Sequence, residues 1–164
     1  MNIILIGMPG SGKSTLGVLL AKTMGLHFTD TDIVIQKREK KLLQEIIKDQ
    51  GMEAFLDKEM MAVLSVQCED TVIATGGSVI FREKAIEHLK KLGKLVYLDL
   101  DFEEIEKRLK NIKTRGIAMS SNKTLKDIYQ DRKPLYEQYA DITINCKNKE
   151  AEEIVEIIQK ALME

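Results

Sequence analysis

Short apolar segments alternate along this chain with longer segments in which apolar residues recur at helical spacing. Most of the short segments are continuous apolar runs, which is typical of strands buried on both faces of a parallel sheet. We expect five strands, at residues 2–6, 26–30, 71–75, 94–100 and 142–146. We expect helices at residues 16–24, 33–47, 52–66, 81–92, 102–109, 125–139 and 151–162.

This alternation predicts an α/β fold and also the place of its ligand site. Right-handed crossovers put the C-terminal ends of parallel strands at one edge of the sheet, where ligands of such folds bind. Polar clusters directly follow three of the expected strands, at residues 7–15, 30–32 and 76–78. We expect these clusters to meet in one site. The absence of an internal repeat or linker predicts a single domain over residues 1–164.

The first polar cluster has the pattern G-x-x-x-x-G-K-[ST] of a P-loop, or Walker A motif, at residues 7–14. It stands between an expected strand and an expected helix, which is the context that the motif requires. Its glycines let successive backbone N–H groups point at a polyphosphate, and the helix N-terminus adds partial positive charge. We expect a nucleoside triphosphate to be bound by Gly10, Ser11, Gly12, Lys13, Ser14 and Thr15.

Side chains in and near this loop predict magnesium-dependent phosphate chemistry. Lys13 can reach the outer phosphates, and the Ser14 hydroxyl is an oxygen ligand of the kind that Mg²⁺ prefers. Asp30 and Asp32 follow the second strand, where a carboxylate can hold Mg²⁺ through water or accept a proton from a reacting hydroxyl. The alternative is that one of them caps the following helix, and Asp32 is suited to that role.

Two further groups are candidates for binding a substrate. Gly76 and Gly77 follow the third strand, either as a tight connection or as a place where a substrate approaches the backbone. Arg115 lies in a segment with little apolar periodicity, as expected of a lid arginine that moves onto the transferring phosphate. Arg108 and Arg132 are the other candidates, although a single arginine is often only a solvated surface residue.

Composition narrows the choice of partners and location. With 44% apolar and 31% charged residues, the chain has the balance of a globular protein, and its net charge of -1 argues against nucleic acid as a partner. No apolar run approaches the roughly 20 residues that span a bilayer, and we expect no signal peptide before the first strand. Cys68 and Cys146 are far apart, which indicates ordinary thiols and a cytoplasmic protein.

Four elements of the chain form a recognisable set: the P-loop, the F-T-D-T-D segment at residues 28–32, the glycine pair at 76–77 and the R-K-P-L-Y segment at 132–136, which is followed by Ala140–Asp141. Together they resemble the shikimate kinase family over nearly the whole chain. The resemblance implies a three-layer P-loop fold with a five-stranded parallel sheet in the order 2-3-1-4-5 and a mobile lid over about residues 110–124. It also implies transfer of the γ-phosphate of ATP to a hydroxyl of shikimate, a step of aromatic amino-acid synthesis.

The resemblance assigns the phosphate and metal roles residue by residue. Lys13 would contact the β- and γ-phosphates, Ser14 would bind Mg²⁺, and Asp30 would hold the ion through water. Asp32 would bind the reacting hydroxyl and act as its base. These assignments make Asp32, Lys13 and Arg115 the expected catalytic residues.

The remaining roles concern the acceptor and the nucleotide. The backbone at Gly76 and Gly77 would bind the acceptor, and Arg132 would bind its carboxylate. Arg115 would be the lid arginine, and Arg108 would lie against the adenine. Members of the family are often monomeric, so we expect a monomer whose partners are ATP and a small molecule.

Three positions depart from the family pattern. Leu56 stands where the family carries a second arginine for the acceptor carboxylate, Gly116 follows the lid arginine in place of proline, and Ser78 replaces the third glycine of a Gly-Gly-Gly run. Loss of one charge-assisted contact costs about 1.5–3 kcal/mol, or roughly 10- to 150-fold in affinity. Lys58 should point to another side of the same helix and is a poor replacement.

These departures leave three functions open. The first is a shikimate kinase that binds its acceptor weakly, and the second is a kinase for another small hydroxylated acceptor, such as a nucleoside monophosphate, a sugar acid or a hydroxy amino acid. The third is a nucleotide-binding regulatory module without transfer activity. A switch GTPase is not expected, because the nearest match to Asn-Lys-x-Asp, at residues 122–124, lacks the aspartate.

Overall fold

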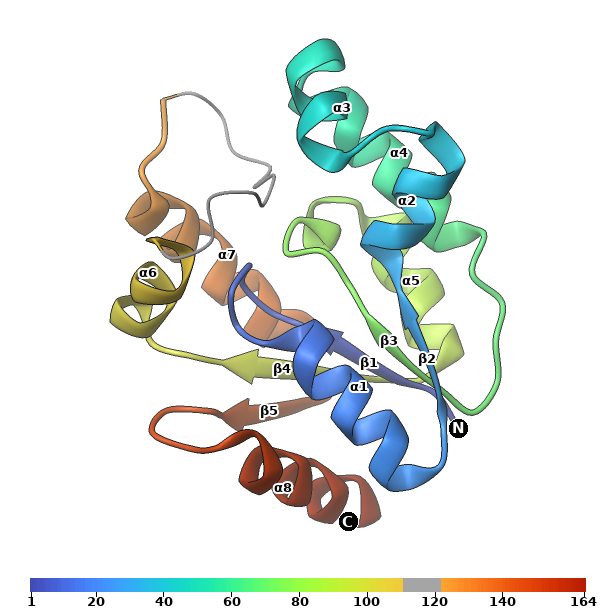
Figure 1. Ribbon diagram of the computed structural model, residues 1–164, viewed down its shortest axis with the longest axis vertical. Coiled ribbons are helices and arrows are strands. Elements are labelled where there is room, and N and C mark those ends of the chain that lie inside the picture. The colour runs from blue at the N-terminus through green and yellow to red at the C-terminus, as the bar shows by residue number, and fades with distance from the viewer. Residues whose placement is uncertain (111–121) are drawn as a thin grey trace.

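The computed structural model describes residues 1–110 and 122–164. Its sheet is parallel throughout and has the strand order β2-β3-β1-β4-β5 (Figure 1), which confirms the expected order. The strands are β1 (Ile3–Ile6), β2 (His27–Asp30), β3 (Thr71–Ala74), β4 (Lys94–Asp99) and β5 (Ile142–Asn145).

Helices cover both faces of this sheet, which gives the expected three layers (Figure 1). Helices α1 and α8 pack against each other on one face, while α4, α5 and α7 lie on the other. The helices are α1 (Lys13–Met24), α2 (Thr31–Glu39), α3 (Leu43–Gln50), α4 (Met52–Leu64), α5 (Glu83–Leu92), α6 (Phe102–Lys110), α7 (Leu125–Tyr139) and α8 (Ala151–Met163), with a short 3₁₀ helix η1 (Val79–Phe81). Within the described part of the chain, no helix has the length and apolar character needed to cross a membrane.

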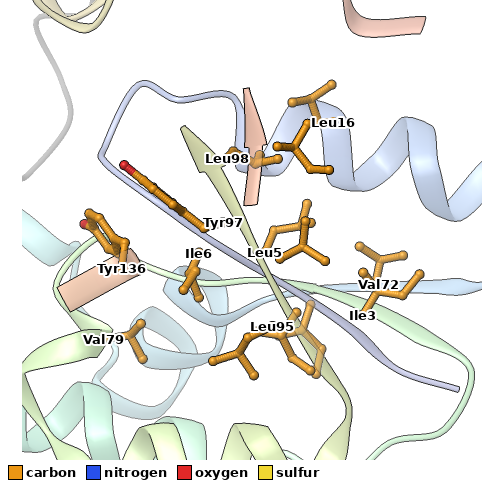
Figure 2. Close-up of a cluster of buried hydrophobic side chains, with 14 of the residues drawn as sticks. Ile3, Leu5, Ile6, Leu16, Val72, Val79, Leu95, Tyr97, Leu98 and Tyr136 are labelled. Atoms are coloured by element: carbon orange, nitrogen blue, oxygen red, sulfur yellow. The ribbon is translucent and has the colours of Figure 1, made fainter. Parts of the chain in front are cut away.

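The core forms around β1, the central strand, all four residues of which are fully buried. Figure 2 shows the two faces: Leu5 lies toward Leu16 of α1, and Tyr97 lies toward Tyr136 of α7. The two tyrosine rings are stacked, with their centroids 5.2 Å apart. Because α1 and α7 pack on opposite faces of the sheet, side chains from the two helices can approach its C-terminal edge from opposite sides.

The predicted helix over residues 33–47 is wrong in one respect, because the structure has two helices there. Helix α2 ends at Lys40, whose φ of 54° is in the left-handed region. That conformation stops a helix even without glycine. The chain therefore turns after α2, and α3 and α4 follow as separate helices that pack on each other and on α2.

Candidate active site

The P-loop connects β1 to α1 and has the backbone that its glycines predict. Gly7, Gly10 and Gly12 all have positive φ, at 150°, 82° and 95°, which residues with a Cβ rarely adopt. Lys13 is buried, and its Nζ donates hydrogen bonds of 2.8 Å to the carbonyl oxygens of Gly7 and Met8. These bonds hold the lysine across the loop, with its charge beside the amides that would face a phosphate.

A pair of oxygen ligands stands at the start of α1. The Ser14 hydroxyl donates a 2.8 Å hydrogen bond to Oδ2 of Asp30, which comes from the end of β2. A hydroxyl and a carboxylate beside a phosphate loop suit Mg²⁺, which binds oxygen and takes its other ligands from phosphate and water. Among the described residues, no group of three or more His, Cys, Asp or Glu side chains could hold a metal ion. An ion at Ser14 and Asp30 would therefore need phosphate and water as its other ligands.

The structure also decides which aspartate caps α2. Oδ1 of Asp30 accepts a 2.9 Å hydrogen bond from the backbone N–H of Asp32, so Asp30 is the N-cap. The alternative that Asp32 caps this helix is wrong, because the helix starts two residues earlier than its apolar pattern indicates. Asp32 instead lies in the first turn, with its side chain toward Gly76.

Gly76 allows two carboxylates to come close to the loop after β3. A Cβ at Gly76 would lie 2.5 Å from Oε2 of Glu59 and 2.9 Å from Oδ1 of Asp32. Both distances are too short for a real carbon atom, so a larger residue would fit here only if one of these two carboxylates shifted. The aspartates and the glycine pair, which are far apart in the sequence, therefore meet at the predicted edge of the sheet.

Gly77 brings the P-loop and α7 to the same place. A Cβ there would lie 2.6 Å from Cδ of Pro9 and 3.0 Å from Nη1 of Arg132. Tyr136, one turn after Arg132 on α7, donates a 2.5 Å hydrogen bond to the Gly77 carbonyl oxygen. The Arg132 guanidinium is buried and lies 5.3 Å from the centre of the Phe81 ring, in cation–π range.

Glu59 of α4 belongs to this site, although the sequence analysis did not identify it. Its side chain is buried, Oε1 accepts a 2.8 Å hydrogen bond from the Ser78 hydroxyl, and Oε2 has no hydrogen-bond partner among the described residues. Burial raises its pKa to about 7; Asp32 adds to the shift, while the Ser78 hydrogen bond, Arg132 and Lys13 oppose it. In the sequence, the only indication that Glu59 is buried is its position four residues after Phe55 on the same expected helix.

Leu56, the position of the missing arginine, lies in a small apolar cluster. It is buried there together with Ile35, Ile46, Phe55 and Ala62. Nζ of Lys58 makes a 2.6 Å ion pair with Oε2 of Glu39. Lys58 is therefore directed to the partner helix α2, as its place on α4 predicts, and does not replace the arginine.

A cavity of about 480 Å³ beyond the P-loop suits the base of a nucleotide. Helix α6 lines one side of it, including Arg108, and the other side includes Cys146 and Asn148, which follow β5. Arg108 also donates a 3.2 Å hydrogen bond from Nη1 to the carbonyl oxygen of Gly10. Its guanidinium thus joins the phosphate loop to the cavity, beside the place expected for adenine.

Three candidates remain. Ser11 is buried in the P-loop, and its Oγ has no hydrogen-bond partner among the described residues. Thr15, in the first turn of α1, is exposed. Arg115 and most of the expected lid lie at residues 111–121, outside the described residues.

Comparisons with known proteins agree with this geometry. The family model for shikimate kinase matches residues 9–163. A shikimate kinase of Clostridium botulinum (strain ATCC 19397 / Type A) is 40% identical over 154 residues, which are 92% of this chain and 91% of that protein.

Solved structures of two shikimate kinases are similar along nearly the whole chain. The enzyme of Acinetobacter baumannii, in complex with shikimate, has a TM-score of 0.89 at 30% identity and covers 99% of this chain and 92% of its own. The enzyme of Aquifex aeolicus has a TM-score of 0.84 at 33% identity, with 99% and 96% covered. On the evidence of the P-loop, the converging acceptor groups and these matches, the chain belongs to the shikimate kinase family.

Proposed function

We propose that this protein transfers the γ-phosphate of ATP to a hydroxyl group of shikimate, giving shikimate 3-phosphate and ADP. The observation that carries the proposal is the meeting of two half-sites at one sheet edge. The P-loop supplies Lys13 and the Ser14–Asp30 pair, and the opposite side supplies Asp32, the glycine pair and Arg132. The contact of Gly77 with both Pro9 and Arg132 joins the two halves directly.

The nucleotide half binds and orients the triphosphate. The loop amides and the N-terminus of α1 hold the phosphates, and Lys13 exchanges its contacts with the loop carbonyls for contacts with the outer phosphates. Ser14 and Asp30 would hold Mg²⁺, which when bound neutralises charge on the β- and γ-phosphates. Arg108 stacks on or beside the base in the neighbouring cavity. We infer that Arg115 closes over the transferring phosphate.

The acceptor half aims one hydroxyl at the γ-phosphorus. The acceptor oxygen forms the new P–O bond while the bond between the γ-phosphorus and the β,γ-bridging oxygen breaks, and ADP carries away that electron pair. Asp32 takes the hydroxyl proton, because it is the carboxylate that lies in the first turn of α2 beside the glycine pair. Positioning and charge neutralisation supply most of the rate enhancement in such transfers.

Recognition of the acceptor rests on Arg132 and on backbone groups. Arg132 is held against Gly77 and Phe81, so its guanidinium is oriented before the acceptor arrives. It would pair with the acceptor carboxylate, and the N–H groups of Gly76 and Gly77 would bind oxygen atoms of the acceptor. With Leu56 buried in an apolar cluster, the carboxylate has one arginine in place of two, and we expect weak binding of shikimate.

Leu56 also supports a second candidate function, which is phosphorylation of a different small hydroxylated acceptor. With leucine at this position, the acceptor half of the site has one arginine fewer. It therefore suits an acceptor with less negative charge than a site with two arginines would. A regulatory module without transfer activity remains the third candidate. The Asp32 carboxylate beside Gly76 of the acceptor loop supports transfer over simple nucleotide binding.

A coupled assay of ADP formation separates these candidates. Purified protein is mixed with Mg-ATP and shikimate, and in parallel with a nucleoside monophosphate, a sugar acid and a hydroxy amino acid, and products are identified by mass. Turnover of shikimate supports the proposal. Turnover of another acceptor alone supports the second function, and calorimetric ATP binding without any turnover supports the third. Size-exclusion chromatography in the same buffer tests our inference that the active form is a monomer.

A further inference from the structure

Glu59 is a buried titratable group that the reaction as proposed does not use. Its carboxyl group lies between α4 and the loop at Gly76–Ser78, and only about 2% of the residue is exposed. Oε2 has no hydrogen-bond partner among the described residues, which is unusual for a carboxylate oxygen sealed from water. A group in this state either is neutral or destabilises its surroundings.

Glu59 contacts the acceptor loop at two points. Oε1 accepts the hydrogen bond from Ser78, and Oε2 packs against Gly76 at the place where a Cβ would clash. From the other side, Tyr136 of α7 holds the carbonyl of Gly77. The loop Gly76–Ser78, which includes the two glycines whose backbone would bind the acceptor, is therefore clamped between α4 and α7, and Glu59 is the α4 half of the clamp.

We propose that Glu59 is a positioning residue of the acceptor site, which as a neutral acid holds the Gly76–Ser78 loop in its binding shape and releases it on ionisation. This inference rests on the proposed function, because it assumes that the loop binds the acceptor. It adds a group that acts through the loop and need not touch the substrate. It also predicts that acceptor binding, and not the chemical step, depends on the charge of Glu59.

The charges around Glu59 determine the direction of the effect. Asp32 on α2 repels an ionised Glu59, whereas Arg132 on α7, Lys13 on α1 and the Ser78 hydroxyl favour it. Burial outweighs these favourable contacts, and the resulting pKa is about 7. Below that pH Glu59 is neutral and can lie close to Asp32. Above it, an unsolvated carboxylate faces Asp32 beside Gly76, and the repulsion between the two carboxylates acts on the loop that both contact.

The wild-type KM for shikimate should therefore rise as the pH increases through about 7, at saturating Mg-ATP. If only the neutral form binds, KM rises by up to about tenfold for each pH unit above the break. The acceptor carboxylate does not produce this break, since an ordinary carboxylic acid has a pKa of about 4.

Glu59→Gln is the central test. Glutamine has the same shape, its carbonyl oxygen can accept from Ser78, and its amide mimics the neutral acid. We expect a nearly flat KM between pH 6 and 8.5 in this variant, with a kcat close to that of the wild type. Asp57→Asn is the matched control, because Asp57 is on the same helix but is exposed and paired with Arg82, so the break should persist. A break that persists unchanged in Glu59→Gln overturns the inference.

Ser78→Ala tests the same group without altering its charge. Loss of the Ser78 hydroxyl removes a contact that favours the ionised form, so the break should move to higher pH. This variant decides the matter if thermal melting shows that Glu59→Gln does not fold. An unshifted break, or one that moves to lower pH, contradicts the proposal.

A measurement that needs no turnover separates this inference from the proposed function. In protein labelled with ¹³C at the glutamate carboxyl carbons, one resonance should titrate near pH 7 and be missing in Glu59→Gln. If no glutamate titrates between pH 6 and 8, the inference fails whatever the acceptor is. If that resonance is present but shikimate is not turned over, the proposed function fails, and the KM comparison is made with the acceptor that the panel identifies.

Discussion

Leu56→Arg tests whether the acceptor site binds weakly because one cation is missing. Leu56 and Glu59 are three residues apart on α4 and so share one face of the helix. An arginine at position 56 can keep its methylene groups in the apolar cluster while its guanidinium extends toward the acceptor loop. We therefore expect the charge to reach the acceptor carboxylate opposite Arg132.

The gain in affinity and the loss in folding stability are of similar size, but they act on different equilibria. One added charge-assisted hydrogen bond contributes about 1.5–3 kcal/mol, so KM for shikimate should fall roughly 10- to 150-fold. Loss of a fully buried leucine costs about 1.5–3 kcal/mol of folding stability, of which the arginine stem restores a part. Because the unfolding free energy of a domain is about 5–15 kcal/mol, the variant should still fold.

The assay compares KM and kcat for shikimate at saturating Mg-ATP in the wild type, Leu56→Arg and Leu56→Met. Methionine has a similar volume and no charge, so Leu56→Met should leave KM unchanged. The arginine should also lower the pKa of Glu59, because an opposite charge favours the carboxylate, and the break in KM should move below pH 7. The predicted fall in KM therefore refers to the KM of each protein at a pH below its own break. An unchanged or raised KM in a folded Leu56→Arg variant would refute the placement of the carboxylate.

Three further variants test the remaining contacts. Lys13→Ala should abolish turnover while the melting temperature stays within a few degrees, as measured by the coupled assay and circular dichroism. Asp32→Asn should lower kcat by at least about 100-fold with little change in ATP affinity by calorimetry, whereas equal losses of both would contradict its role as base. Tyr136→Phe leaves the Gly77 carbonyl without its donor, at a cost of about 1–3 kcal/mol, and should raise KM for shikimate more than it lowers kcat.

The two departures from the family pattern in α4 and the acceptor loop meet in the folded protein. Leu56 removes a cation from the helix that carries Glu59, and Ser78 supplies a hydroxyl that Glu59 accepts from. The first change favours the neutral carboxyl group, and the second gives one of its oxygens a partner. The Ser78 hydroxyl is therefore a hydrogen-bond donor to a buried carboxyl group that has no arginine at position 56.

Local features of the chain were predictable from the sequence alone. The P-loop is one continuous segment whose glycines must adopt positive φ, so its shape follows from its own residues. The strand positions and the meeting of three polar clusters at one edge followed from apolar runs and from crossover handedness. The strand order itself came from resemblance to a family, because an apolar pattern does not specify which strands pair.

Choices between local alternatives needed the structure. Asp30 and Asp32 are both suitable helix caps, and only the start of α2 at Thr31 assigns that role to Asp30. The end of α2 at Lys40 was likewise missed, since nothing in the sequence indicates that this lysine adopts a left-handed conformation. In both cases two local conformations have similar energies, and packing against the rest of the fold selects one of them.

Only the tertiary structure revealed the surroundings of Glu59. Its neighbours Asp32, Ser78 and Arg132 come from α2, the loop after β3 and α7, and none is close to it in the sequence. The sequence by itself determined that a phosphate-binding loop would stand at a sheet edge with two aspartates. Which buried group would be neutral depended on desolvation, and desolvation is a property of neighbours that only the folded chain brings together.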